Sequence, residues 1–276
     1  MKKQDLIYKG ANGKLAGYDL AIPDHFNGTL IYFIHGYKGY KNWGAWDLIS
    51  DFFYDKGYGF AKCNLSHNGT SLSHPNAFTD LDAFAENTYS YELEDIKSFI
   101  NTVNSQIQQP VQSRVLIGHS RGGGDVILSA ENNINILVTW ASISNIENRF
   151  LKGEALNKWK TEGVYSVLNG RTKQHMPHNY SFYQDYIQNS DRLNILKAAK
   201  KLTLPWAIIH GTKDTSVTIS EGLELKNACK HSQFIEIKGA NHVFGAKEPY
   251  HSSQLPEHTL DLVTQTLNFI KEQTKQ

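Results

Sequence analysis

Cysteine is scarce in this chain, because only Cys63 and Cys229 occur among its 276 residues. Two cysteines do not make a disulfide framework, and we expect both thiols to be unpaired. The HExxH, CxxC and HxH spacings of common metal sites are also missing, although the chain contains twelve histidines. The sequence therefore predicts neither a disulfide scaffold nor a dedicated metal site.

Excess charge and long apolar runs are lacking as well. The 28 basic and 27 acidic residues leave a formal charge of +1, which gives no electrostatic case for binding nucleic acid or an anionic membrane. No apolar run approaches the roughly 20 residues that cross a bilayer. No apolar signal core follows the N-terminal lysines. If Met1 is the native start we expect a cytoplasmic protein, although a chain whose signal had been removed would look the same. The oligomeric state is left open.

Short apolar segments alternate with segments of helical periodicity along most of the chain. Residues 5–22 predict a β-hairpin with its turn near Asn12-Gly13. Apolar stretches predict six further strands, at 29–34, 60–64, 115–117, 136–141, 206–210 and 234–237. Helical periodicity is found at 44–56, 86–107, 121–131, 219–230 and 255–272. This order predicts an α/β fold in which a mostly parallel eight-stranded sheet has helices on both faces.

One long segment, 146–200, contains no strand candidate. A structureless loop of that length is improbable, so we expect a small, mostly helical insertion. We call it the cap and place it over the carboxyl edge of the sheet, where ligands bind in such folds. The predicted core is then a single domain made of residues 1–145 and 201–276.

Aromatic side chains are frequent in the cap. The simplest interpretation is that they form a small core of their own. In the alternative, Trp159, Tyr183 or Tyr186 would bind substrate by lining a pocket for an aromatic or acyl group.

Residues 118–122 carry the most informative motif, Gly-His-Ser-Arg-Gly, between a predicted buried strand and a predicted helix. A serine at such a corner is held in a strained conformation, with its hydroxyl clear of the sheet and the positive end of the helix beneath it. Gly118 and Gly122 are needed because a Cβ there would collide with the neighbouring strand and helix. Ser120 is therefore predicted to be a nucleophile.

A serine nucleophile requires a base that is itself oriented by a carboxylate. Asp214 follows the predicted strand at 206–210, and His242 follows the last predicted strand. Both lie at carboxyl ends of strands, so they are expected to meet Ser120 at one edge of the sheet. His251 and His258 are the alternatives for the base.

A carbonyl group attacked by a serine also requires hydrogen-bond donors for its developing oxyanion. Residues 35–39 read His-Gly-Tyr-Lys-Gly directly after the predicted strand at 29–34, and such a glycine-flanked turn can direct a backbone N–H inward. We predict that the backbone N–H groups of Tyr37 and Arg121 form the oxyanion hole.

With these parts the chain resembles the α/β-hydrolase superfamily over essentially its whole length. The resemblance implies that Ser120 is the nucleophile, Asp214 the orienting acid and His242 the general base, with Tyr37 and Arg121 as oxyanion donors. Within the superfamily it is most similar to serine esterases and to acyl-peptidase-like and dienelactone-hydrolase-like enzymes with an HGxxG turn. Feruloyl-type esterases belong to this group. It lacks the HGGG run of lipases. It also has serine where dienelactone hydrolases have cysteine and haloalkane dehalogenases have aspartate.

We therefore expect a serine-dependent hydrolase that needs no cofactor and cleaves a small-molecule carboxylic ester with a small to medium acyl or aryl group. A peptidase or amidase with the same machinery is the nearest alternative. A non-catalytic protein that binds a small molecule, and a haloperoxidase-like or acyltransferase activity, are the others.

The remaining polar residues have simpler interpretations. Arg121 and Asp125 are four residues apart on one predicted helix, so a local ion pair is expected, with attraction of an acidic substrate group as the alternative. His35 and His210 lie at strand ends and are expected to hold loops. Three acidic residues of the helix at 86–107 are expected to face solvent: Glu92, Glu94 and Asp95.

Overall fold

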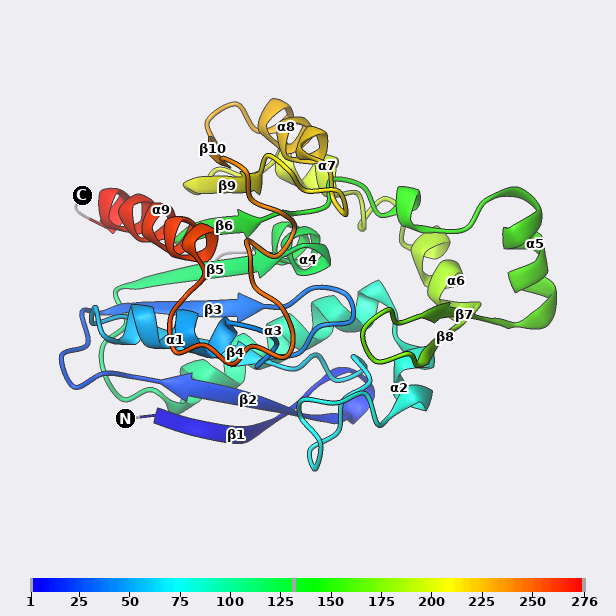
Figure 1. Ribbon diagram of the computed structural model, residues 1–276, viewed down its shortest axis with the longest axis horizontal. Helices are drawn as coiled ribbons and strands as arrows, with labels where there is room; N and C mark the ends of the chain where they lie inside the picture. Colours follow the sequence, from blue (N-terminus) through cyan, green and yellow to red (C-terminus); the bar gives the residue numbers. More distant parts are fainter. Residues whose placement is uncertain (1, 131–132, 275–276) are drawn as a thin grey trace.

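A single eight-stranded sheet forms the centre of the computed structural model, which describes residues 2–130 and 133–274 (Figure 1). The spatial order is β1-β2-β4-β3-β5-β6-β9-β10. Only the pairs β1–β2 and β2–β4 are antiparallel, and the other neighbours are parallel. The predicted fold class is confirmed. The strands are β1 (Lys2–Lys9), β2 (Leu15–Ala21), β3 (Thr29–Ile34), β4 (Gly59–Cys63), β5 (Ser113–His119), β6 (Ile136–Trp140), β9 (Trp206–Gly211) and β10 (Gln233–Ile237).

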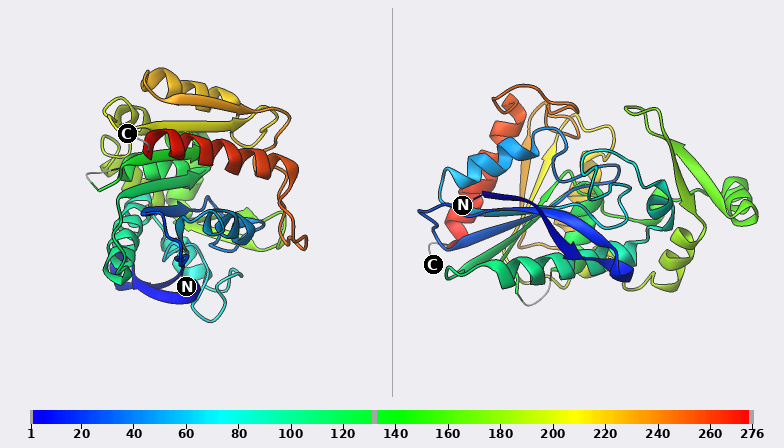
Figure 2. Two further views of the ribbon diagram at one scale, coloured as in Figure 1. Left: turned by 90° about the vertical axis from the view of Figure 1, so that its left-hand side faces the viewer. Right: turned by 90° about the horizontal axis from the view of Figure 1, so that it is seen from below.

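Helices cover both faces of this sheet, and β3 shows why. Its residues alternate in direction, so Leu30, Tyr32 and Ile34 join one apolar cluster while Ile31 and Phe33 join another. The first cluster packs under α3 (Tyr89–Gln106), α4 (Arg121–Ser129) and α8 (Ile219–Ala228), and the second under α1 (Trp46–Tyr54) and α9 (Glu257–Thr274). Figure 2 shows α1 and α9 side by side on one side of the sheet.

The structure has two helices, each with its own capping residue, where the sequence predicted one helix at 86–107. Asp80 accepts a hydrogen bond from Ala83 N and begins a separate short helix, α2 (Leu81–Glu86). Thr88 then accepts one from Tyr91 N and begins α3. The end of the predicted helix at 121–131 lies outside the described residues, and α4 is described to Ser129.

The cap differs from its prediction because it contains two strands. β7 (Val164–Leu168) and β8 (His175–Asn179) pair as an antiparallel hairpin. β7 exposes every second residue, β8 alternates buried with less buried residues, and both contain polar side chains, so they lack the continuous apolar run of the buried strands. The cap projects from the edge of the sheet at which β3 and β5 end (Figure 1). Its other elements are η2 (Glu147–Arg149), α5 (Gly153–Glu162), α6 (Ser181–Gln188) and α7 (Ile195–Ala199).

The last cap helix contacts the core. α7 packs against α4 and α8, which belong to the helical layer over the sheet. The division of the chain at residues 146 and 200 therefore stays a prediction. Both cysteines, Cys63 and Cys229, are free thiols in buried positions, as expected. Within the described chain, no helix has the length and apolar character that a membrane crossing requires.

Candidate active site

Ser120 lies at a strained turn between β5 and α4. Its backbone has φ 58° and ψ −119°, in the region that a residue with a Cβ rarely adopts. Ser120 N donates to Trp140 O at 2.9 Å, and Ser120 O accepts from Gly123 N at 3.0 Å, which holds the turn between two neighbouring elements. The crowding predicted for the flanking glycines is confirmed, since a Cβ on Gly118 would lie 2.2 Å from Gly122 O.

The residues that sequence reasoning named as nucleophile, base and acid are connected by hydrogen bonds. His242 Nε2 lies 3.0 Å from Ser120 Oγ, and His242 Nδ1 lies 2.7 Å from Asp214 Oδ2. The three residues follow β5, β9 and β10, and parallel strands bring these ends to one edge of the sheet. His242, and not His251 or His258, therefore contacts the acid.

Asp214 is held as a fully buried carboxylate, since its side chain is 0% exposed. Its Oδ1 accepts from Ser216 N at 2.8 Å and Val217 N at 2.9 Å. Burial opposes ionisation, but hydrogen bonds from His210 and His242 outweigh it and hold the pKa of Asp214 well below its ordinary value. His210 Nε2 donates to Val217 O at 2.9 Å, which is the loop-holding role expected for this histidine.

Residues 35–39 form a turn directly beside Ser120, which we call the oxyanion turn. In the register of β3 and β5, Ile34 pairs with Gly118, and a Cβ on Gly36 would lie 2.8 Å from Ser120 Cβ. His35 holds the turn by donating from Nδ1 to Gly36 O at 2.9 Å. Burial lowers the pKa of His35 to about 4, so the ring is neutral near pH 7.

The two predicted oxyanion donors lie at this junction. Tyr37 belongs to the oxyanion turn, and Arg121 is the first residue of α4. In the part of the chain that the structure describes, neither backbone N–H meets a protein acceptor. The first N–H groups of a helix have no partner within it, and they attract negative charge. Both donors belong to residues next to the close contact of Gly36 with Ser120, and their role as oxyanion donors stays a prediction.

Comparisons with known proteins identify the architecture. No protein-family model and no curated protein matches the sequence, but many solved structures match the fold. Alpha/beta hydrolase domain-containing protein 10 from mouse is 17% identical, with a TM-score of 0.67 over 98% of this chain and 99% of that chain. The chain has the α/β-hydrolase fold. Est1E from Butyrivibrio proteoclasticus, solved with ferulic acid bound, is 19% identical, with a TM-score of 0.72 over 98% of this chain and 100% of that chain.

A larger protein also contains this α/β-hydrolase fold. Pyrococcus horikoshii acylaminoacyl peptidase is 15% identical, with a TM-score of 0.67 over 98% of this chain but only 41% of that chain. At these identities the comparisons show the fold alone, and the chemistry has to be argued from the site.

A cavity of about 110 Å³ opens beside Ser120 and His242. The oxyanion turn forms one wall, and the other lining residues are Trp43, Trp46, His119 and Val243. His119 Nε2 donates to His242 O at 2.9 Å, so it holds the backbone of the proposed base. Burial lowers the pKa of His119 to about 3, which keeps its ring neutral. No group of three or more His, Cys, Asp or Glu side chains within residues 2–130 and 133–274 is arranged to hold a metal ion.

The three aromatic residues proposed for substrate binding lie in the aromatic cluster of the cap. Trp159 is 1% exposed and donates from Nε1 to His178 O at 2.9 Å. Tyr183 and Tyr186 pack against Phe150, with ring centroids 5.2 and 5.1 Å away. This placement agrees with a core of the cap's own. A substrate-binding role for these residues stays a prediction, because other residues line the cavity at Ser120.

The predicted ion pair between Arg121 and Asp125 is wrong. Arg121 Nη1 instead lies 3.3 Å from Glu92 Oε1 on α3, and Glu92, 3% exposed, is buried rather than solvent-facing. Asp95 is 0% exposed, so its predicted exposure is wrong as well. Burial and the nearby Glu92 raise the pKa of Asp125 well above its ordinary value.

The Arg121 guanidinium also lies over three aromatic rings. Its Cζ is 4.2 Å from the ring centroid of Tyr37, 5.1 Å from that of Tyr89 and 5.3 Å from that of Phe182. Sequence reasoning missed this arrangement, since it joins the oxyanion turn, α3 and α6 of the cap. The side chain of Arg121 thus ties the cap to the core.

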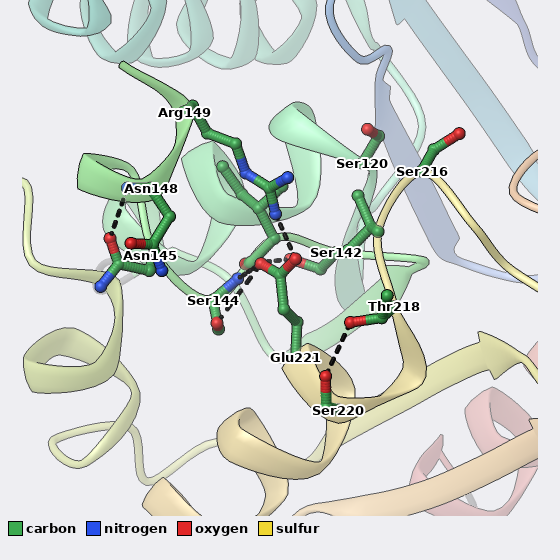
Figure 3. Close-up of polar contacts among 12 residues, drawn as sticks. Ser120, Ser142, Ser144, Asn145, Asn148, Arg149, Ser216, Thr218, Ser220 and Glu221 are labelled. Carbon is green, nitrogen blue, oxygen red and sulfur yellow. Dashed lines mark hydrogen bonds and ion pairs between the residues drawn. The ribbon is translucent and has the colours of Figure 1, made fainter. Parts of the chain in front are cut away.

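A second polar group lies beside Ser120, between the loop after β6 and the start of α8 (Figure 3). Arg149 of the cap forms an ion pair with Glu221, and Ser144 N donates to Glu221 Oε2 at 3.0 Å. These contacts fasten the first turn of the cap to the core.

Proposed function

We propose that the protein is a serine hydrolase that cleaves a carboxylic ester with a small to medium acyl or aryl group through an acyl-enzyme. The observation that carries the proposal is the continuous hydrogen-bond chain Ser120–His242–Asp214, which lies beside two backbone N–H groups without an acceptor. Each member supplies a part that serine catalysis requires.

In the first half-reaction, His242 Nε2 takes the proton of Ser120 as Oγ attacks the ester carbonyl carbon. Asp214 holds the ring with Nδ1–H pointing at its carboxylate and stabilises the imidazolium that forms. The N–H groups of Tyr37 and Arg121 donate to the oxyanion of the tetrahedral intermediate. One such donor is worth about 2.7–4 kcal/mol of transition-state stabilisation.

His242 then gives this proton to the leaving alcohol, which ends the first half-reaction with the acyl group on Ser120. In the second half-reaction, a water molecule loses a proton to His242 and attacks the acyl carbon. The bond between the acyl carbon and Ser120 Oγ breaks, His242 returns the proton to Oγ, and the acid leaves. The cycle balances without a cofactor.

The lining of the cavity supports an ester over a peptide substrate. A peptidase that recognises a free amine requires an acidic group near the serine, and none of the described residues that line the cavity is Asp or Glu. The indole rings of Trp43 and Trp46 instead offer an apolar wall for an acyl or aryl group. The ferulic acid bound to the similarly folded Est1E is consistent with this choice.

Replacement of the serine tests the proposal. Ser120→Ala should abolish turnover of a p-nitrophenyl acyl ester and labelling by a fluorophosphonate probe, with an unchanged circular dichroism spectrum. Ser166→Ala, which removes an exposed serine hydroxyl of β7, should change neither. Retained turnover in Ser120→Ala would refute the nucleophile. Absence of labelling in the folded wild-type protein would support a non-catalytic binding protein instead.

A matched pair of substrates tests the bond that is cleaved. An ester and an anilide of the same acyl group should differ strongly, with a higher kcat/KM for the ester. A higher kcat/KM for the anilide would support the peptidase alternative.

A further inference from the structure

Lys38 of the oxyanion turn is a half-buried cation that lines the same cavity as Ser120 and His242. Among the described residues, no carboxylate or other hydrogen-bond acceptor meets its ammonium group, which lies 5.1 Å from the ring centroid of Tyr37. Three other partly or fully buried lysines are paired with a carboxylate. Lys14 lies 2.7 Å from Asp80, and both Lys41 and Lys62 contact Asp19, at 2.8 and 2.6 Å.

The charge at Lys38 is not balanced by its surroundings. Burial and the positive charge of Arg121 lower the pKa of Lys38, which shows that its cation is poorly compensated. Arg121 contacts the same Tyr37 ring, but its charge is offset by Glu92 at 3.3 Å. The described lining of the cavity contains no acidic residue. The wall beside the serine therefore carries a positive charge that an anion would neutralise.

The backbone at Lys38 gives a second, independent reason to expect a role for its side chain. Its φ is +56°, a conformation in which glycine is free of strain and a residue with a Cβ is not. A lysine at this position carries a conformational cost that the turn itself does not require. Backbone strain of this kind is concentrated at ligand-binding and catalytic positions.

We propose that Lys38 binds a carboxylate of the substrate, so that the preferred ester carries a negative charge close to the bond that is cleaved. A half-ester of a short dicarboxylic acid carries this charge on its acyl part, and an ester of a hydroxy acid carries it on its alcohol part. This inference rests on the proposed function and adds a substrate class to it.

Two pairs of substrates that differ only in charge test the inference. Monoethyl adipate and ethyl adipamate place a carboxylate or its neutral amide on the acyl part. The compounds para-acetoxybenzoate and para-acetoxybenzamide do the same on the alcohol part. In at least one pair, wild-type kcat/KM should be about ten- to a hundredfold higher for the carboxylate, as expected for a partly buried charge-assisted hydrogen bond.

Variants of Lys38 test whether the preference for the carboxylate substrate depends on the positive charge of this side chain. Lys38→Met should lower kcat/KM more for the carboxylate member than for the neutral amide member and so remove the preference, whereas Lys38→Arg should keep most of it. Lys173→Met is the matched control, because Lys173 also has a positive φ, +60°, but is exposed on the turn between β7 and β8. This control should leave both members of each pair unchanged.

The outcomes separate this inference from the proposed function. Equal wild-type rates for carboxylate and amide in both pairs would overturn the inference. So would an equal loss for both members in Lys38→Met, since the ammonium would then act only on the oxyanion. If the wild-type protein hydrolyses none of the four esters, the proposed ester hydrolysis fails. Calorimetric binding of monoethyl adipate and ethyl adipamate to Ser120→Ala then decides: tighter carboxylate binding that Lys38→Met abolishes supports the inference, and equal binding overturns it.

Discussion

Replacing Arg121 by methionine should destabilise the fold strongly while leaving the proposed oxyanion donor in place. The side chains of Arg121 and Glu92 are only 11% and 4% exposed, so Arg121→Met would leave a buried carboxylate without its cation. Glu92 would keep one hydrogen bond, from Asn87 Nδ2 at 2.6 Å. Removing one partner of a buried ion pair typically costs about 3–5 kcal/mol.

The loss of unfolding free energy in Arg121→Met can also be derived from proton uptake by Glu92. A buried glutamate without its cation can lose its charge by binding a proton, which for an ordinary glutamate costs about 3.7 kcal/mol at pH 7. This sets an upper bound on the electrostatic loss, and it agrees with the range for broken buried pairs. At pH 5 the same proton uptake costs about 1 kcal/mol. The loss of unfolding free energy in Arg121→Met should therefore shrink from about 4 kcal/mol at pH 7 to about 1–2 kcal/mol at pH 5.

Urea denaturation followed by circular dichroism at both pH values measures this loss. The double variant Arg121→Met/Glu92→Gln should be more stable than the sum of the single losses predicts, by at least about 2 kcal/mol. Arg171→Met is the control, because Arg171 is exposed and also lies over aromatic rings, and its loss should stay below about 1 kcal/mol. A loss under about 1 kcal/mol for Arg121→Met, or an equal loss at pH 5 and pH 7, would refute the reasoning.

Two further predictions concern the site itself. Gly36→Ala places a Cβ 2.8 Å from Ser120 Cβ and should lower kcat/KM for a p-nitrophenyl ester at least about a hundredfold. The control Gly170→Ala, whose added Cβ would have no atom within 4 Å, should leave kcat/KM unchanged. Wild-type activity in Gly36→Ala would contradict the close approach. Asp214→Asn should lower kcat/KM about 10³–10⁴-fold at every pH from 5 to 8, because hydrogen bonds from the histidines outweigh burial and keep the pKa of Asp214 well below its ordinary value. The same lowered pKa of Asp214 stabilises the wild type above about pH 4, and that stabilisation should be lost as the pH falls further. A difference in unfolding free energy between wild type and Asp214→Asn that is the same at pH 5 and pH 3 would contradict this.

Local sequence determined the strands of the sheet and the residues at their ends. An apolar run followed by a glycine and then, within three residues, a polar residue is a signal contained in about ten neighbouring residues, and it marked Ser120, Asp214 and His242. In a parallel sheet the carboxyl ends of the strands share one edge, so the predicted topology was enough to expect their convergence. The hydrogen bonds of 3.0 and 2.7 Å in the structure agree with that expectation.

Contacts between distant segments were decided only by the tertiary structure. Periodicity relates residues three or four apart, so it paired Arg121 with Asp125, whereas the packing of α3 on α4 brought in Glu92 from 29 positions earlier in the chain. The hairpin of the cap escaped prediction because its strands are half-exposed and partly polar. The unbalanced charge of Lys38 depends on which side chains fail to reach it, and that is a property of the folded chain as a whole.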